Sequence, residues 1–198
     1  MVRRITVDLF AEDRAHEDFL KAIIGRIARE HNTEPDLHIG SARGGHARAI
    51  DELKSYQEAK LKVGGGRLPD ILVAAIDANC KPFTKAKKDI AESLLPEFAP
   101  NAVIACPEPH IERWFMADPA SFKQVVGASP TLVRYKCNRD RYKSLLADTV
   151  ARGGQPPLLG GIEFARELVE AMDLRRVSGT EKSLHAFINA MTARLKSL

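Results

Sequence analysis

The sequence lacks the features that mark membrane and secreted proteins. No stretch of the 198 residues approaches the ~18 consecutive apolar residues that a membrane span needs, and Met1–Arg4 leads into a short strand-like run instead of a long apolar signal segment. Cys80, Cys106 and Cys137 are an odd number without C-x-x-C spacing, which argues against a disulfide framework and a tetrahedral zinc site. We therefore expect a cytoplasmic protein with reduced thiols and no membrane contact.

Aromatic residues are also few, at 6%, and no G-x-x-x-x-G-K-[ST] motif is present, so any ATP hydrolysis would have to come from a partner protein. The remaining composition is that of an ordinary globular chain, with 44% hydrophobic and 28% charged residues. The formal net charge of +4 is unevenly spread, because residues 1–130 carry −1 and residues 131–198 carry +5. This basic excess at the C-terminal end permits contact with a polyanion.

Strand-like runs alternate with amphipathic helical patterns over the first part of the chain. The strand-like runs are residues 4–10, 37–39, 69–77 and 102–106. The helical patterns cover about 15–31, 46–62 and 83–95, and a further one begins near residue 110. This order predicts an α/β fold with a doubly wound, mainly parallel, Rossmann-like sheet. We expect that domain to span residues 1–120, with a helical C-terminal subdomain packed on it over residues 121–198.

Polar residues with oxygen ligands follow three of the expected strands. They are Glu12 after the first, Asp77 and Asn79 after the third, and Glu108 and Glu112 after the last. Ligands of open parallel sheets collect at the carboxyl ends of the strands, and carboxylate and amide oxygens suit Mg²⁺ or Mn²⁺. The joint placement predicts a divalent-metal site. For single residues such as Glu12, capping of a helix N-terminus is an alternative.

Three segments resemble the TOPRIM family. Phe10–Leu20 looks like the TOPRIM opening, in which a strand ends in a Glu followed by a turn and a helix. Ile71–Asn79 resembles its second signature, a buried strand ending in Asp-x-Asp. Cys106–Pro119 is similar to a stretch of uncharacterised prokaryotic TOPRIM-like proteins, some of them associated with ATPase partners and phage defence. The resemblance covers roughly residues 1–120.

The resemblance implies phosphodiester chemistry on DNA or RNA. It makes Glu12 the general acid/base or metal-positioning residue, and Asp77 with Asn79 the metal-binding pair. The sequence departs from the family in having Asn79 for the second Asp, and this loss of a negative charge should weaken Mg²⁺ binding. The expected activity is cleavage of a nucleic-acid strand with Mg²⁺ or Mn²⁺, with Glu108 or Glu112 as further candidate acids.

Two residues near the start of the expected fourth helix, His110 and Glu112, have two interpretations each. Pro109 fits the first position of a helix, which would place His110 in its first turn. His110 is then either a hydrogen-bonded structural imidazole or a catalytic group. Glu112 is either an ion-pair partner or part of the active site, and Trp114 is expected in the core.

Two basic segments are candidate contacts for a phosphate backbone. In the first, Arg43 and His46 flank a Gly-rich loop at a helix N-terminus, although a plain turn explains this loop equally well. The second combines basic side chains with interleaved tyrosines, as single-strand binders do, and an exposed helix entry is its alternative. Its basic residues are Arg134, Lys136, Arg139 and Arg141.

The sequence therefore favours a small metal-dependent nuclease and leaves two alternatives. The first is a catalytically degenerate TOPRIM-like module that holds nucleic acid or an ATPase partner. The second is a phosphatase or nucleotide-processing enzyme that uses the same carboxylates on a small substrate. A long polyanion would lose affinity steeply as salt rises, and a small nucleotide would not.

Overall fold

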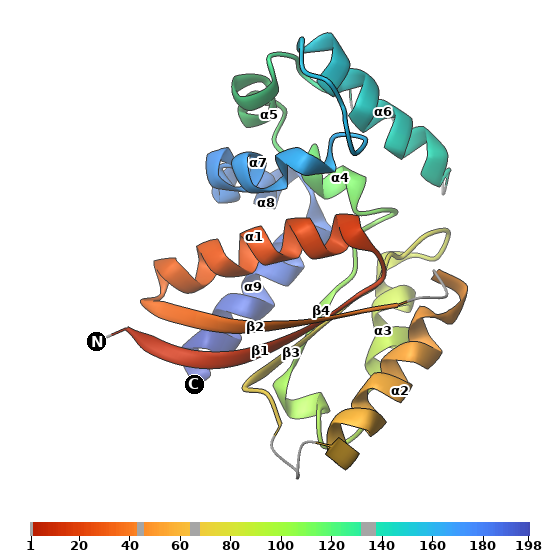
Figure 1. Cartoon of the computed structure of the whole chain (residues 1–198), viewed down its shortest axis with the longest axis vertical. Coiled ribbons are helices and arrows are strands. Elements are labelled where there is room, and N and C mark those ends of the chain that lie inside the picture. The colour runs from red at the N-terminus through yellow and green to blue at the C-terminus, as the bar shows by residue number, and fades with distance from the viewer. Residues whose placement is uncertain (1, 43–45, 64–67, 132–137) are drawn as a thin grey trace.

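The computed structural model describes residues 2–42, 46–63, 68–131 and 138–198, without the side chains of residues 46 and 47. Four parallel strands form one sheet in the order β2-β1-β3-β4 (Figure 1). They are β1 (Arg3–Ala11), β2 (Thr33–Ser41), β3 (Ile71–Ala75) and β4 (Ala102–Ala105). The predicted α/β fold with a parallel, Rossmann-like sheet is thus confirmed.

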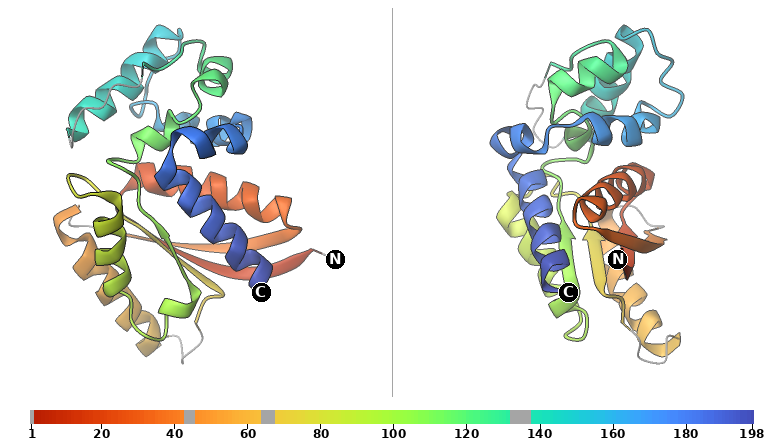
Figure 2. Two further views of the ribbon diagram at one scale, coloured as in Figure 1. Left: turned by 180° about the vertical axis from the view of Figure 1, so that it is seen from behind. Right: turned by 90° about the vertical axis from the view of Figure 1, so that its left-hand side faces the viewer.

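Helices cover both faces of the sheet (Figures 1 and 2). One face carries α1 (Arg14–Glu30) and α9 (Lys182–Ser197), and the other carries α2 (His46–Val63) and α3 (Phe83–Glu92). Successive residues of a strand point to opposite faces, so the neighbours Leu9 and Phe10 belong to different cores. All five residues of β3 are buried, because this central strand is covered on both sides.

The strand order creates a switch point between β1 and β3. The connection through α1 leads from β1 to β2, whereas the connection through α3 leads from β3 to β4 in the opposite direction. The two helices lie on opposite faces, as two crossovers of the same hand require. In such sheets ligands bind at the carboxyl ends of the strands that flank the switch point. Here those ends are Ala11 and Ala75.

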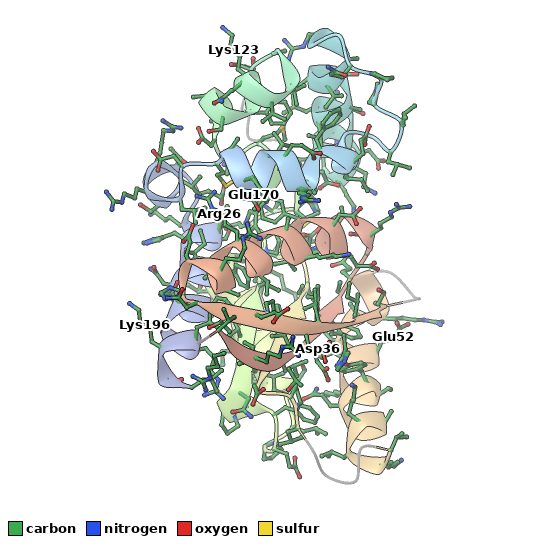
Figure 3. The ribbon with its side chains drawn as sticks, turned by 60° about the vertical axis from the view of Figure 1, so that its left-hand side comes forward. Arg26, Asp36, Glu52, Lys123, Glu170 and Lys196 are labelled. Carbon is green, nitrogen blue, oxygen red and sulfur yellow. The ribbon has the colours of Figure 1, made fainter. Side chains whose placement is uncertain are left out.

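Short helices form a further layer outside α1 (Figure 2). They are α4 (Glu112–Phe115), α5 (Pro119–Val126), α6 (Arg139–Arg152), α7 (Ala165–Ala171) and α8 (Leu174–Thr180), with a 3-10 turn at Ile162–Phe164. Another 3-10 turn, Ala99–Asn101, directly precedes β4. The seam between α1 and α7 is polar at one end, where Arg26 donates to the carbonyls of Val169 at 2.6 Å and Met172 at 2.7 Å. Figure 3 shows Arg26 close to Glu170, which pairs with Arg29.

Two elements differ from the expected pattern. Strand β2 is longer than residues 37–39 and contains Pro35, which an edge strand tolerates because only one side of it is hydrogen-bonded. The helix expected near residue 110 begins only at Glu112. Pro107 and Pro109 disfavour helical backbone in Cys106 and Glu108, the residues before them. Glu108 is consequently not helical and does not share a helical face with Glu112.

Candidate metal centre

The carboxyl ends of β1 and β3 bring Glu12 and Asp77 together. The N–H of Glu12 donates to the Ala75 carbonyl at 3.0 Å and so extends the β1–β3 ladder by one residue. The N–H of Asp77 in turn donates to Glu12 Oε2 at 3.0 Å. Both residues are buried, with exposed fractions of 1% and 2%. Backbone geometry thus fixes two carboxyl side chains inside the protein at the switch point.

His16 joins this pair from the first turn of α1. Its Nε2 lies 3.0 Å from Asp77 Oδ1, and its Nδ1 lies 2.8 Å from Asp13 Oδ1. Asp13 is the N-cap of α1 and also accepts from the N–H of His16, which holds the imidazole in place. On the other side, Nδ1 of His110 lies 3.1 Å from Asp77 Oδ2. Asp77 is therefore held between two imidazoles.

Arg139 closes the cluster from the C-terminal helices. It stands at the start of α6, where Asn138 is the N-cap. Its guanidinium pairs with Asp13 and lies 3.4 Å from Glu12 Oε1. Arg139, a residue of the basic segment, thus lies beside Glu12 and Asp13, the two acids between β1 and α1.

The charges of this cluster shift the pKa of its members. Burial alone would lower the pKa of His16, but the charge of Asp77 and hydrogen bonds to Asp13 and Asp77 raise it to about 10. Burial would raise the pKa of Asp77, and the opposing effects of His16 and His110 lower it. The pKa of Asp13 is lowered by His16 and Arg139 against the effect of its burial. At neutral pH the centre therefore holds an imidazolium between carboxylates.

Three of these side chains have the geometry of a metal site. Glu12, His16 and Asp77 each offer one ligand atom, and these atoms lie within 4.8 Å of one another. The three residues are buried, so the ligands are preorganised by the surrounding core. Two carboxylates and one imidazole suit a divalent cation, provided that His16 gives up a proton. The donor set therefore fits a divalent metal ion.

Asn79 and Glu108 line a separate cavity of about 740 Å³. Asn79 has a positive φ of 51°, and its N–H donates to the Pro109 carbonyl at 2.9 Å. Glu108 is exposed and accepts from the N–H of Phe83 at 3.3 Å, which places it at the start of α3. The structure therefore brings Glu12 and Asp77 together with His110, and places Asn79 and Glu108 toward a neighbouring space.

Glu112 lines a second, smaller cavity of about 280 Å³. Its exposed fraction is 1%, and no residue in the described part of the chain hydrogen-bonds its Oε2. Burial and the nearby charge of Asp77 raise the pKa of Glu112. Trp114, two residues on, is a core residue as expected and donates from Nε1 to Ser183 Oγ at 2.8 Å.

The expected phosphate contacts fall into two groups. Arg43, Arg134 and Lys136, and the side chain of His46, lie outside the described residues. Of the remaining two, Arg139 is turned inward to Glu12 and Asp13, whereas Arg141 is exposed.

The sequence did not single out His16. A signal for it exists, because Asp13 and His16 occupy the N-cap and third helical positions that interact reciprocally in a capping box. Nothing in the sequence, however, shows that the other ring nitrogen would reach Asp77, 61 residues away.

Comparison with family models, curated proteins and solved structures finds no match. Among the described residues, no helix is both long and apolar enough to cross a bilayer.

Proposed function

We propose that this protein is a nuclease that hydrolyses phosphodiester bonds of DNA or RNA with Mg²⁺ or Mn²⁺. The observation that carries the proposal is the buried Glu12–His16–Asp77 cluster at the switch point, which combines metal-ligand chemistry with the position where open α/β sheets bind substrates. The TOPRIM resemblance of the strand ends at Glu12 and Asp77 supports the same chemistry.

The residues have distinct roles in this proposal. Glu12, Asp77 and neutral His16 hold the cation, which when bound polarises a phosphoryl oxygen and lowers the pKa of a bound water. His110 is a positioning residue, because its hydrogen bond fixes the second oxygen of Asp77. Asp13 orients His16, because its Oδ1 contacts both the backbone N–H and the ring Nδ1 of His16.

A degenerate binding module is a second candidate, and Arg139 favours it. The guanidinium of Arg139 and the imidazolium of His16 already neutralise Asp13 and stand beside Glu12 and Asp77. Because two cations of the protein already stand against the three carboxylates, the cluster has less need of a metal ion. Such a protein would hold nucleic acid or an ATPase partner through its basic C-terminal part.

Metal titration and a cleavage assay separate the two candidates. Calorimetry with Mg²⁺ and Mn²⁺ is performed on the wild type, Glu12→Gln, Asp77→Asn and the control Asp36→Asn, which alters an exposed aspartate of β2 (Figure 3). The nuclease proposal expects saturable binding in the wild type and in Asp36→Asn, and loss of binding in the other two. Cleavage of single- and double-stranded DNA and RNA should be abolished by EDTA and fall at least about a hundredfold in Asp77→Asn.

Two other results of these experiments would reject the nuclease proposal or its active site. If no metal binds and no strand is cleaved, while strands bind with a steep salt dependence, the binding module is correct. Metal-dependent cleavage that survives in Asp77→Asn would place the active site elsewhere.

A further inference from the structure

Glu112 is a buried carboxyl group, and one of its two oxygens, Oε2, has no hydrogen-bond partner among the described residues. Glu112 is the first residue of α4, and its exposed fraction is 1%. A buried polar atom that lacks a hydrogen bond destabilises the fold, so such atoms are rare and call for a specific explanation. A ligand that donates a hydrogen bond to Oε2 is one.

The cavity beside Glu112 has the size of a site for a small ligand. Its volume of about 280 Å³ is close to the lower limit for ligand pockets, so it can hold one ring system. Its apolar walls come from the start of α1, from α6 and from the segment before α7. The lining residues are Asp13, Arg14, Ala15, Glu112, Lys143, Leu146, Leu159, Gly160 and Ile162.

The charges around the cavity narrow the class of ligand. Arg14 and Lys143 are exposed cations on its lining, and they disfavour a free ammonium ligand for Glu112. The same cations favour a ligand that is attached to phosphates. A nucleobase that carries phosphate has these features: a flat ring with apolar faces, a hydrogen-bond donor on its edge and phosphates beside it. The proposed function makes it a base of a strand.

We propose that this cavity takes up one unstacked, amino-bearing nucleobase of the substrate strand and that Glu112 accepts a hydrogen bond from its exocyclic amino group. The proposal rests on the proposed function for its substrate class. Asp13 lines the cavity and also bonds His16 of the metal centre, so a base held here would lie next to that centre. Burial raises the pKa of Glu112 and so favours the neutral carboxyl group. This group can also donate a hydrogen bond to the ring nitrogen beside the amino group of adenine or cytosine.

The test compares two strands that differ only in that amino group. Fluorescein-labelled pentanucleotides with thymines around a central adenine, or around a central unsubstituted purine, are titrated with protein in EDTA. Binding is followed by fluorescence anisotropy, in deoxyribose and ribose series. We expect the wild type to bind the adenine strand about tenfold more tightly than the purine strand in at least one series.

Variants of Glu112 show whether it causes the preference. Glu112→Met fills the same space without polar atoms, so it should fold with an unchanged or higher melting temperature and reduce the preference below twofold. Glu112→Gln keeps an accepting oxygen and should retain a larger preference than Glu112→Met. Glu167→Met, at an exposed position of α7 off the cavity, should behave as the wild type.

A wild-type preference below twofold in both series would overturn the inference, as would an undiminished preference in Glu112→Met or the binding of neither strand. The cleavage assay tests the nuclease function separately from the base pocket. Cleavage without any preference for adenine would leave the nuclease standing and reject the base pocket. A preference in binding without metal-dependent cleavage would support the pocket and reject the nuclease.

Discussion

Asp77 is the residue on which the centre depends. Its two carboxylate oxygens face different imidazoles, and its N–H donates to Glu12. A carboxylate that is held at both oxygens has a fixed orientation, which is the property that a metal ligand needs. The same contacts keep Asp77 ionised although it is buried.

Replacement of His16 should make the folding stability depend on pH in a defined way. The pKa of His16 is raised from its ordinary value of 6.5 to about 10, so between these pH values the folded protein binds more protons than the unfolded chain. The contribution of His16 is therefore complete below about pH 6.5 and is lost as the pH rises through about 10. We expect His16→Gln to lower the free energy of unfolding by about 3 kcal/mol at pH 6 and by clearly less at pH 10.

Urea denaturation in EDTA at pH 6, 8 and 10 measures this effect. The control is His185→Gln, which alters a half-buried histidine of α9 that bonds Asn189. A cost of His16→Gln that is equal at the three pH values would show that His16 is not charged in the folded protein.

The sequence predicted Glu12 and Asp77 because strand ends are visible in hydrophobic patterns, and the ends of parallel strands meet. It could not predict the contact of Arg139 with Asp13, because 126 residues separate them and the packing of α6 determines the contact. For Glu112 the sequence left two interpretations open. The choice depends on a cavity that exists only once α6 and the segment before α7 are packed.

At the scale of elements, Arg139 links the N-terminus of α6 to the start of α1. Its guanidinium is a cation beside Glu12, where a metal ion would also stand. Removal of this charge should raise the affinity for Mn²⁺ by roughly tenfold, because Arg139 then no longer competes with the metal ion for Glu12. Calorimetry of Arg139→Gln with Mn²⁺ measures this affinity. The control is Arg152→Gln, which alters an exposed arginine at the other end of α6. A lower affinity in Arg139→Gln would instead mean that Arg139 supports the metal site.

The ends of α5 and α6 meet at two glycines. A Cβ on Gly153 would lie 2.0 Å from the Val126 carbonyl oxygen, so the two helix ends approach too closely for any side chain. Gly153→Ala should destabilise the protein by about 2–4 kcal/mol, because the backbone must shift. Gly179→Ala in α8, where a Cβ meets nothing within 4 Å, should cost nothing or stabilise slightly. Equal melting temperatures of the two variants would contradict this packing.

The whole molecule combines a predictable sheet with a less predictable helical layer. The alternation of strand and helix patterns determined the parallel sheet, since a parallel connection needs a crossover helix. The position of α9 has no such local signal. Its apolar residues, such as Phe187 and Met191, pack with the sheet core, and Arg194 donates to the Asp70 carbonyl at 2.9 Å. The last helix of the chain thus covers the face of the sheet that α1 leaves open.

This arrangement predicts that residues 1–120 do not fold alone. Without α9 one face of β4 is exposed, and without α7 the outer side of α1 loses its packing, so a large apolar area meets water. A fragment of residues 1–120 should give poorly dispersed amide NMR signals and no cooperative melting transition, whereas the full chain melts in one transition. Addition of a separate peptide of residues 181–198 should not restore the fold, because the α1–α7 seam is still missing. Well-dispersed signals from the fragment would show instead that the α/β domain is independent of the helical layer.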